Sequence, residues 1–261
     1  AGGFFTAYYA LMMTEHMRRY GTTETQMGLV SVKNHRNALS NPYSCMPMSL
    51  TVEEVLNSPM VVSPYKKFDC AILADGAAAL VMSTERWARD HSTAWRDRPR
   101  VYFTGSGCAT ERVRLGDRPQ PYPGYAHFRA KQEAAKVAYQ MSGIKDARKE
   151  IDVAELADTF TGAELQAYEA LGFCEAGESG KLSEQGVFDI GGQLPTNTSG
   201  GLIGQGAPPG GMGIAQGVEI LAQLREERPA AVQVRGARTG LMDIHGGTSS
   251  FAVVSIFSRE D

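Results

Sequence analysis

The sequence predicts an α/β fold, and three stretches of its second half support that prediction. They are a strand, loop and helix at 151–171, a glycine-rich run leading into a helix at 191–225, and a pair of strands at 231–257. A strand followed by a loop and a helix is the repeating unit of α/β proteins. Ligands of open α/β folds gather at the carboxyl ends of strands, so we expect a site among these loops.

The N-terminal part of the chain predicts helices with recognisable starts and stops. Apolar residues at helical spacing, cap residues and prolines mark their limits. The predicted segments are a helix at 4–19, a helix that Thr23-Glu-Thr-Gln caps and Asn41-Pro42 ends, a short capped helix at 51–57, and an extended stretch between Pro59 and Pro64.

The middle of the chain predicts strands and one long helix. Cys70 to Met82 is a nearly continuous apolar run, which is typical of a central strand covered on both faces. A second strand is predicted at 100–104 and a helix at 126–142, after Pro123-Gly124. The loop between them contains three arginines. We expect them to be exposed to solvent, as charged loop residues usually are, and phosphate binding is the alternative. These are Arg112, Arg114 and Arg118.

The C-terminal elements place short polar motifs at the ends of strands. We predict a strand at 151–156, the motif 157–160 at its end, and a helix at 163–171. The last two strands, 231–242 and 249–257, are predicted to be antiparallel around Asp243-Ile-His-Gly-Gly.

Composition excludes several classes of protein. The 261 residues carry a formal charge of -3, so there is no general basic field for nucleic acid. The four cysteines form no C-x-x-C pair, which predicts neither a metal site nor a disulfide framework and favours a reducing cytoplasm. No apolar run approaches the roughly 20 residues that span a bilayer, so we expect no membrane association. The chain starts at Ala1 without methionine, and we expect a fragment or the ordered part of a longer chain.

The run 191–216 is the most constrained stretch. Glycine loses more backbone entropy on folding than any other residue, so many glycines in a folded segment indicate tight turns or backbone pressed against a ligand. A flexible linker would not contain Leu194, Leu202 and Ile203 or continue into an apolar helix. We therefore expect a binding site here.

The motifs of the chain resemble those of the thiolase superfamily. They occur in the family's order over nearly the whole chain, and together they resemble its sterol-carrier-protein or lipid-transfer branch. The matching segments are Val32-Lys-Asn-His-Arg-Asn-Ala38 with Asn41-Pro42, Leu73-Ala-Asp-Gly-Ala-Ala-Ala79, Ala157-Asp-Thr-Phe-Thr161, Thr196-Asn-Thr-Ser-Gly-Gly201, Gly206-Ala-Pro-Pro-Gly-Gly-Met-Gly213 and Asp243-Ile-His-Gly-Gly-Thr-Ser249.

The resemblance implies the layered α-β-α-β-α thiolase fold and a coenzyme A thioester as substrate, with no bound cofactor. Residues 1–125 would be the remainder of the N-terminal half with its loop domain, and 126–261 the C-terminal half. A homodimer is implied. The segment with the nucleophilic cysteine would precede Ala1. Candidate contacts to the thioester or its coenzyme A are Asn197, Ser199, Gly200, Gly206, Gly246, Gly247, Lys33 and His35. For Lys33 and His35, a solvated helical face is the alternative.

The resemblance fails at the catalytic positions. Ala207 occupies the place of the family's histidine, Ala157 that of the polar residue before Asp158, and Ile244 or its neighbour that of the acid/base cysteine. Alanine and isoleucine side chains transfer no proton. This pattern is similar to that of thiolase-like aldolases of steroid side-chain degradation. Those enzymes work with a partner that has a zinc-ribbon and OB-fold domain, so the resemblance implies such a partner here.

Three hypotheses follow. The first is a lyase that cleaves a β-hydroxyacyl-CoA by retro-aldol chemistry, which needs a base for the hydroxyl group and donors for the enolate. Candidate bases are Asp243, His245 and Asp158, although His245 could anchor a turn and Asp158 could cap one. The second is an acyl-CoA acetyltransferase whose cysteine lies in the absent segment. The third is a non-catalytic subunit that binds acyl-CoA.

Overall fold

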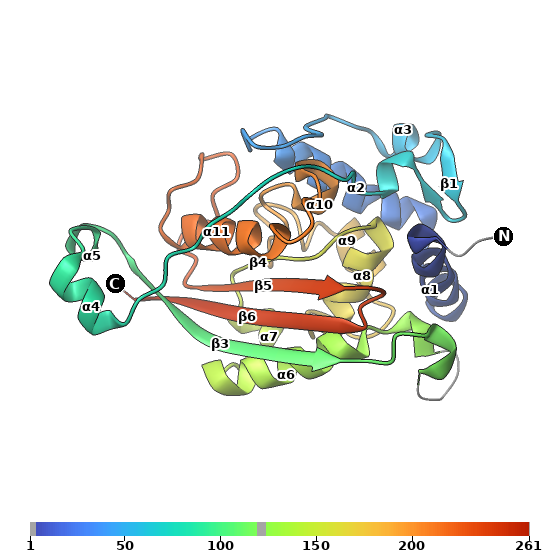
Figure 1. The fold of residues 1–261 in the computed structure, drawn as a ribbon. Coiled ribbons are helices and arrows are strands. Elements are labelled where there is room, and N and C mark those ends of the chain that lie inside the picture. The colour runs from blue at the N-terminus through green and yellow to red at the C-terminus, as the bar shows by residue number, and fades with distance from the viewer. Residues whose placement is uncertain (1–3, 119–123, 261) are drawn as a thin grey trace.

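A four-stranded sheet forms the centre of the molecule. The computed structural model describes residues 4–118 and 124–260. The strand order is β3-β6-β5-β4, with β3–β6 and β6–β5 antiparallel and β5–β4 parallel (Figure 1). The strands are β3 (Arg100–Thr110), β4 (Val153–Glu155), β5 (Thr239–Gly246) and β6 (Phe251–Glu260). A separate pair of short strands, β1 (Met60–Val62) and β2 (Tyr65–Lys66), lies near the N-terminal helices.

Helices cover both faces of the sheet. On one face α6 (Arg129–Ser142) packs on β3 and β6, and α1 (Phe5–Tyr20) and α8 (Thr161–Ala170) complete the main hydrophobic core. On the other face α11 (Met212–Leu224) packs on β5 and β4 around Ile220, Leu224 and Phe257. Because strand side chains alternate, Leu241 of β5 faces the first core while Gly240 faces Ile220 of α11.

The capped helices predicted from the sequence are confirmed. In α2 (Glu24–Ala38) Thr23 accepts a hydrogen bond from the Gln26 amide, and Gln26 accepts one from the Thr23 amide. Thr51 and Glu54 form the same capping box on α3 (Val52–Leu56). Two orphan backbone N–H groups are satisfied in each case, which fixes where each helix starts. The helix predicted at 4–19 is α1.

Later elements also follow the prediction, with shifted limits. The predicted helix at 126–142 is α6, preceded by a turn of 3₁₀ helix at Gly124–Ala126, and Pro123 lies outside the described residues. The final strands are antiparallel as predicted, but β5 begins at Thr239 and includes Asp243 and His245 instead of ending before them. The remaining helices are α4 (Glu85–His91), α5 (Ala94–Asp97), α7 (Ala147–Glu150), α9 (Ser179–Glu184) and α10 (Gly201–Gln205).

The buried strand predicted at 70–82 is wrong. Within the described chain this segment forms only isolated bridges, from Cys70 to Phe160 and from Leu73 to Ala207. The side chains of Leu73 and Val81 are 82% and 93% exposed. An apolar run becomes a central strand only where neighbouring strands pair with it on both sides, and here the segment pairs only near its start.

The exposure predicted for Arg118 is also wrong. Arg118 is buried, and its guanidinium donates to the carbonyl and the hydroxyl oxygen of Thr248, at 2.7 and 2.9 Å. Arg112 and Arg114 are exposed, as expected. A buried guanidinium needs acceptors, and the backbone at the β5–β6 turn supplies them.

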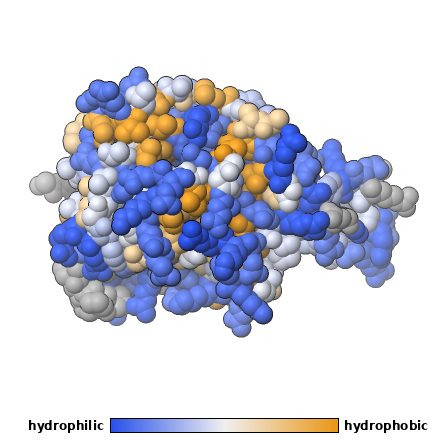
Figure 2. All heavy atoms as spheres, turned by 180° about the vertical axis from the view of Figure 1, so that it is seen from behind, coloured by the Kyte–Doolittle hydropathy of each residue, from blue (hydrophilic) through white to orange (hydrophobic). Residues whose placement is uncertain are grey.

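The surface is mixed. Figure 2 shows the molecule from behind, where hydrophilic residues cover most of the face and hydrophobic residues gather in separate patches. None of the described helices is long and apolar enough to cross a membrane.

The packing of α6 on β3 generates a stability prediction. A Cβ added at Gly107 of β3 would lie 1.9 Å from the carbonyl oxygen of Ala134 in α6, so the helix could keep its place only with glycine there. We expect Gly107→Ala to destabilise the fold by about 1–3 kcal/mol through overpacking. Urea unfolding measures the loss. Gly116→Ala is the matched control, because no atom of the described part of the chain lies within 4 Å of an added Cβ there. An equal loss in both variants would contradict the account.

Candidate active site

The glycine-rich run is folded against the carboxyl end of β4. Thr196 forms a parallel bridge with Ala154 of β4, and the chain then turns through Asn197, at a φ of 50°, and Gly200, at 105°. The short helix α10 follows, and Gly206 ends it at a φ of 102°. These positive φ angles explain why glycine occurs at 200 and 206. The run is therefore a fixed structure, as its composition indicated.

The carboxylate of Asp158 holds the start of α10. It accepts hydrogen bonds from the amides of Leu202, at 2.6 Å, and Ile203, at 3.2 Å, and from the side chain of Asn34, at 2.7 Å. A Cβ at Gly201 would lie 2.3 Å from the same carboxylate. Asp158 is fully buried and its oxygens are occupied by these donors. Its side chain supports the loop, and the catalytic role considered for it stays a prediction.

A second buried carboxylate holds the turn before α10. Glu155 accepts from the amide and the hydroxyl of Ser199, at 3.1 and 2.6 Å, and from the hydroxyl of Thr198. Asn197 is held in the same way, because its side chain accepts from Leu156 N and donates to Glu164. The polar atoms of Asn197 and Ser199 thus face the interior, and the binding role predicted for these residues would fall to their backbone.

Burial changes the acidity of both carboxyl groups. It raises the pKa of Glu155 to about 8, with the neighbouring Glu219 acting in the same direction. Burial and the nearby Glu164 raise the pKa of Asp158 to about 7. A buried carboxyl group without a paired cation favours its neutral form. The loop therefore rests on groups that change charge near neutral pH.

The three positions at which the resemblance implies a catalytic side chain that this chain lacks meet in one place. Ala157, Ala207 and Ile244 belong to a small group of apolar side chains, which we call the apolar cluster. Its other members are Leu202, Ala71 and Met212. Residues from three distant parts of the sequence have thus come together beside the glycine-rich run, and the surface they form is hydrophobic.

Alternation along β5 places the predicted bases on the other face. Ile244 joins the apolar cluster, whereas Asp243 and His245 face α1 and α6. Asp243 is ion-paired with Lys131 of α6, both fully buried, and it accepts the amide of Ala157 at 3.3 Å. The structure therefore brings Asp243 and His245 together but separates them from the apolar cluster by the thickness of the strand.

His245 forms a pair with Tyr9 of α1. The tyrosine oxygen lies 2.6 Å from His245 Nε2 and 2.9 Å from the carbonyl oxygen of Gly247. A carbonyl oxygen only accepts, so the tyrosine proton goes to Gly247 and Nε2 carries the proton that it donates to Tyr9. Nδ1 is then unprotonated, and this buried atom has no hydrogen-bond partner among the described residues. Burial and the charge of Lys131 hold the pKa of His245 well below its usual range, so the ring stays neutral.

The basic residues predicted to contact coenzyme A are buried. The Lys33 ammonium lies 2.6 Å from Glu164 and also donates to Thr196, and His35 Nδ1 lies 2.7 Å from the carbonyl oxygen of Met46. The solvated helical face offered as the alternative is wrong for both. Gly246 ends β5 and Gly247 follows it at a φ of 58°. For all four residues the contact to coenzyme A stays a prediction.

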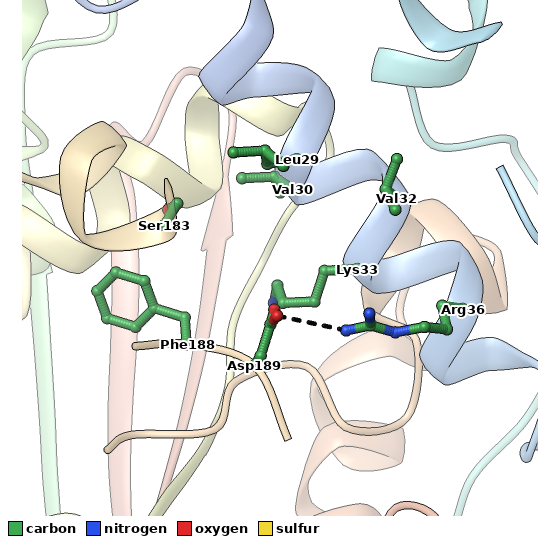
Figure 3. Close-up of a pocket in the computed structure, with 8 residues that line it drawn as sticks. All are labelled: Leu29, Val30, Val32, Lys33, Arg36, Ser183, Phe188 and Asp189. Carbon is green, nitrogen blue, oxygen red and sulfur yellow. Dashed lines mark ion pairs between the residues drawn. The ribbon is translucent and has the colours of Figure 1, made fainter. Parts of the chain in front are cut away.

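A small open hollow with a volume of about 70 Å³ lies between α2 and the segment after α9. Figure 3 shows Arg36 at its edge, 3.5 Å from Asp189, with the side chains of Leu29, Val32 and Phe188 around it. Lys33 contributes to the lining, but its ammonium is held by Glu164. Neither Ala207 nor His245 lines the hollow, so it is separate from both groups described above.

Sequence reasoning missed four buried residues that shape the site. Tyr9 is one of several apolar residues of the helix predicted at 4–19, and nothing in the pattern of α6 marks Lys131 as buried. Glu155 and Glu164 were treated as ordinary residues of a strand and a helix. A charged residue within an apolar segment is the signal that could have drawn attention to them, since buried charges need partners. Among the described residues, no group of three or more His, Cys, Asp or Glu side chains could hold a metal ion.

Comparison with known proteins gives consistent results. Residues 122–259 match the family model described as thiolase C-terminal domain-like. The chain is 41% identical to an acetyl-CoA acetyltransferase of Methanothermobacter thermautotrophicus, over 99% of this chain and 64% of the relative. It is 35% identical to sterol carrier protein 2 of Bos taurus, over 93% of this chain and 43% of the relative. The chain thus spans less than two thirds of the length of these relatives.

Solved structures agree on the fold. A structure named Ltp2-ChsH2(DUF35) aldolase superposes with a TM-score of 0.82 at 25% identity, over 97% of this chain and 63% of that one. An acetyl-CoA acetyltransferase from Bacillus anthracis gives 0.67 at 15% identity, over 95% and 59%. The predicted fold class is therefore confirmed, with this chain covering the C-terminal portion and part of the N-terminal half. The division at 125/126 stays a prediction.

The buried Glu155 generates a prediction on pH. Its pKa is raised from 4.5 to about 8 in the folded state, so between these values the folded protein binds more protons than the unfolded chain, and stability falls as pH rises. Each pKa unit of difference is worth about 1.4 kcal/mol. Glu155→Gln should flatten the loss of stability between about pH 5 and 8. Thermal melts across this range measure it, with exposed Glu53→Gln as control, and an unchanged slope would contradict the assignment.

Proposed function

The chain belongs to the thiolase superfamily, in its sterol-carrier-protein thiolase branch, and we propose that it cleaves a carbon–carbon bond of a β-hydroxyacyl-CoA by retro-aldol chemistry. A function related to acyl-CoA follows from the family. The reaction itself is our proposal, and the apolar cluster is the observation that supports it. No cofactor is needed, and the coenzyme A thioester is the substrate.

The apolar cluster disfavours ordinary thiolysis. A cysteine nucleophile requires a base that makes it a thiolate, and a second acid/base group protonates the leaving carbanion. At the three corresponding positions this chain has Ala157, Ala207 and Ile244, packed together without a titratable side chain. The folded glycine-rich backbone beside them is retained, and with it the means to bind a thioester. A reaction that needs no sulfur nucleophile is consistent with this site.

Retro-aldol cleavage uses the groups that remain. A base removes the proton of the β-hydroxyl group, the bond between the α- and β-carbons breaks, and its electron pair forms the enolate of the thioester. The products are a ketone and, after protonation of the α-carbon, a shorter acyl-CoA. We assign the base to Nδ1 of His245, which is unprotonated and has no partner among the described residues, with Tyr9 as the group that fixes its tautomer. Because Nδ1 is buried, the substrate would have to displace the side chains that cover it. Backbone N–H groups on the same side as His245, at the β5–β6 turn, would stabilise the enolate.

The size of the substrate and the partners are further parts of the proposal. Alanine at 157 and 207 occupies less space than the side chains it replaces, which suits a bulky acyl group such as a steroid side chain. The structural relative at 25% identity is named as an aldolase with two components, Ltp2 and ChsH2(DUF35). By analogy we propose a partner with a zinc-ribbon and OB-fold domain, and a homodimer of the present chain.

An acyl-CoA acetyltransferase is the second candidate. It is favoured by the relative that is 41% identical and named acetyl-CoA acetyltransferase. In that case the nucleophilic cysteine would belong to a part of the protein outside the present sequence. Mass spectrometry of the intact protein after incubation with acetyl-CoA distinguishes the two, because only the transferase forms an acyl-enzyme.

The deciding experiment is an assay of the full-length protein, alone and with a partner of the proposed class. We expect β-hydroxyacyl-CoA thioesters with bulky tertiary hydroxyl groups to yield a ketone and acetyl-CoA or propionyl-CoA, detected by mass spectrometry. Cleavage of β-ketoacyl-CoA that depends on free coenzyme A would instead establish the transferase. Binding of thioesters without turnover of any would establish a non-catalytic subunit.

The pair of His245 and Tyr9 gives a prediction by mutation. General base catalysis contributes about 10²–10⁴-fold to a rate, so His245→Gln should lower kcat by a factor in this range. Tyr9→Phe should lower it less, because the ring nitrogen remains but its tautomer is no longer fixed. Tyr8→Phe, an exposed neighbour on α1, is the control. Turnover unchanged in His245→Gln would show that the base lies elsewhere.

A further inference from the structure

The first turn of α6 contacts the end of β5 through two adjacent pairs of side chains. The ring of Phe128 lies 5.6 Å from that of His245, and the ammonium of Lys131 is bonded to the carboxylate of Asp243. Phe128 and Lys131 are three residues apart, one helical turn, and Asp243 and His245 are two apart on one face of the strand. The ammonium also lies 5.3 Å from the Phe128 ring, which favours a cation. The four side chains thus form one contact.

Asp243 extends this contact to the apolar cluster. The oxygen that accepts from Lys131 also accepts the amide of Ala157, at 3.3 Å. Ala157 follows β4, and its side chain belongs to the apolar cluster with Ala207 and Ile244. Ile244 is itself the strand neighbour of Asp243. One carboxylate therefore joins α6, β5 and the segment after β4 at the point where both faces of the site meet.

We propose that Lys131 and Asp243 are a positioning pair, which sets the backbone of Ala157 and the ring of His245 for the reaction on the acyl-CoA. Neither side chain touches the substrate in this proposal. The inference rests on the proposed function, since it assigns the pair a part in that same site. Its expected consequence is a change in turnover that is separate from any change in stability.

The burial of two charged side chains, Lys131 and Asp243, supports a positioning role. A buried ion pair gains little stability over apolar residues of similar volume, because both ions lose their hydration. Here Lys131 and Asp243 are fully buried, and within residues 4–118 and 124–260 the second oxygen of Asp243 has no hydrogen-bond partner. Packing alone would be served as well by a leucine and a methionine. The charges and the hydrogen bond to Ala157 fix the geometry in a way that apolar residues could not.

The pair also affects the protonation of His245. The groups that face the imidazole are Tyr9 from α1, Lys131 from α6 and Asp243 from its own strand, and Arg118 lies near Tyr9. Burial is the larger cause of the lowered pKa of His245, and the positive charge of Lys131 acts in the same direction. Removing that charge should raise the pKa of His245, so protonated imidazole should appear at a higher pH than in the wild type.

The test uses three variants and a control in the full-length protein. Lys131→Met removes the positive charge at nearly constant length, Asp243→Asn removes the negative charge, and the double variant leaves no unpaired buried ion. Lys136→Met changes an exposed lysine of the same helix, paired with Glu133, and serves as control. Should Lys131→Met fail to fold, Lys131→Gln takes its place, because it keeps a donor toward Asp243.

Two measurements decide the proposal. In the double variant we expect the melting temperature to recover relative to the single variants while kcat remains on the order of tenfold to hundredfold below wild type, with little change in KM. A double variant with wild-type kcat would reduce the pair to a structural role and overturn the proposal.

The second measurement does not depend on turnover. Ring ¹⁵N shifts of His245 followed by NMR across acidic pH should show protonation at higher pH in Lys131→Met than in wild type and in Lys136→Met. An unchanged titration would also overturn the proposal. If the wild type turns over no thioester, the proposed function fails, while the titration still shows whether the pair acts on His245.

Discussion

Carboxyl groups buried at the end of β4 hold the glycine-rich run in place, and the rest of the site depends on them. A segment rich in glycine loses much backbone entropy on folding, so fixed contacts must offset that loss. Glu155 and Asp158 provide them by accepting the amides of Ser199, Leu202 and Ile203. Because the polar side chains of the run face these acceptors, what remains for a ligand is backbone and the apolar cluster. The loop is therefore rigid without offering a catalytic side chain of its own.

The strand β5 carries apolar side chains of the site on one face and its titratable side chains on the other. Ile244 faces the glycine-rich run, while Asp243 and His245 face α1 and α6. The sequence motif that contains all three suggested a single loop, and the strand instead separates their side chains by its alternation. The amide of Ala157 connects the two faces, since it bonds to Asp243 while its side chain packs beside Ala207. Through this hydrogen bond, the apolar cluster on one face of β5 is connected to the charged groups on the other.

Local signals predicted most of the fold, and burial by distant residues accounts for the failures. The capping boxes at Thr23 and Thr51 depend on residues three apart, so the sequence located both helices. The strand predicted at 70–82 required neighbours on both sides, which no local pattern reports. Of the site, the resemblance singled out positions 157, 207 and 244 from separate motifs, and in the structure their side chains meet. The contacts of Lys131 and Tyr9 span more than a hundred residues along the chain, and no periodicity marks such pairs.

The relatives carry names for two different reactions, and the structure explains why overall identity does not choose between them. In the motif from Thr196 to Gly201, side chains bond to Glu155 and Glu164 inside the protein, and Gly201 leaves room for Asp158. Any member of the fold that keeps these carboxylates needs the same motif, whatever bond it makes or breaks. Shared residues of this kind raise identity by describing the scaffold. The reaction depends on the few side chains that reach the substrate, and at three of the positions where the resemblance implies catalytic side chains this chain has alanine and isoleucine. The reaction that we propose therefore depends on His245, and the carbonyl group of Gly247 sets the tautomer of its ring through the hydroxyl group of Tyr9.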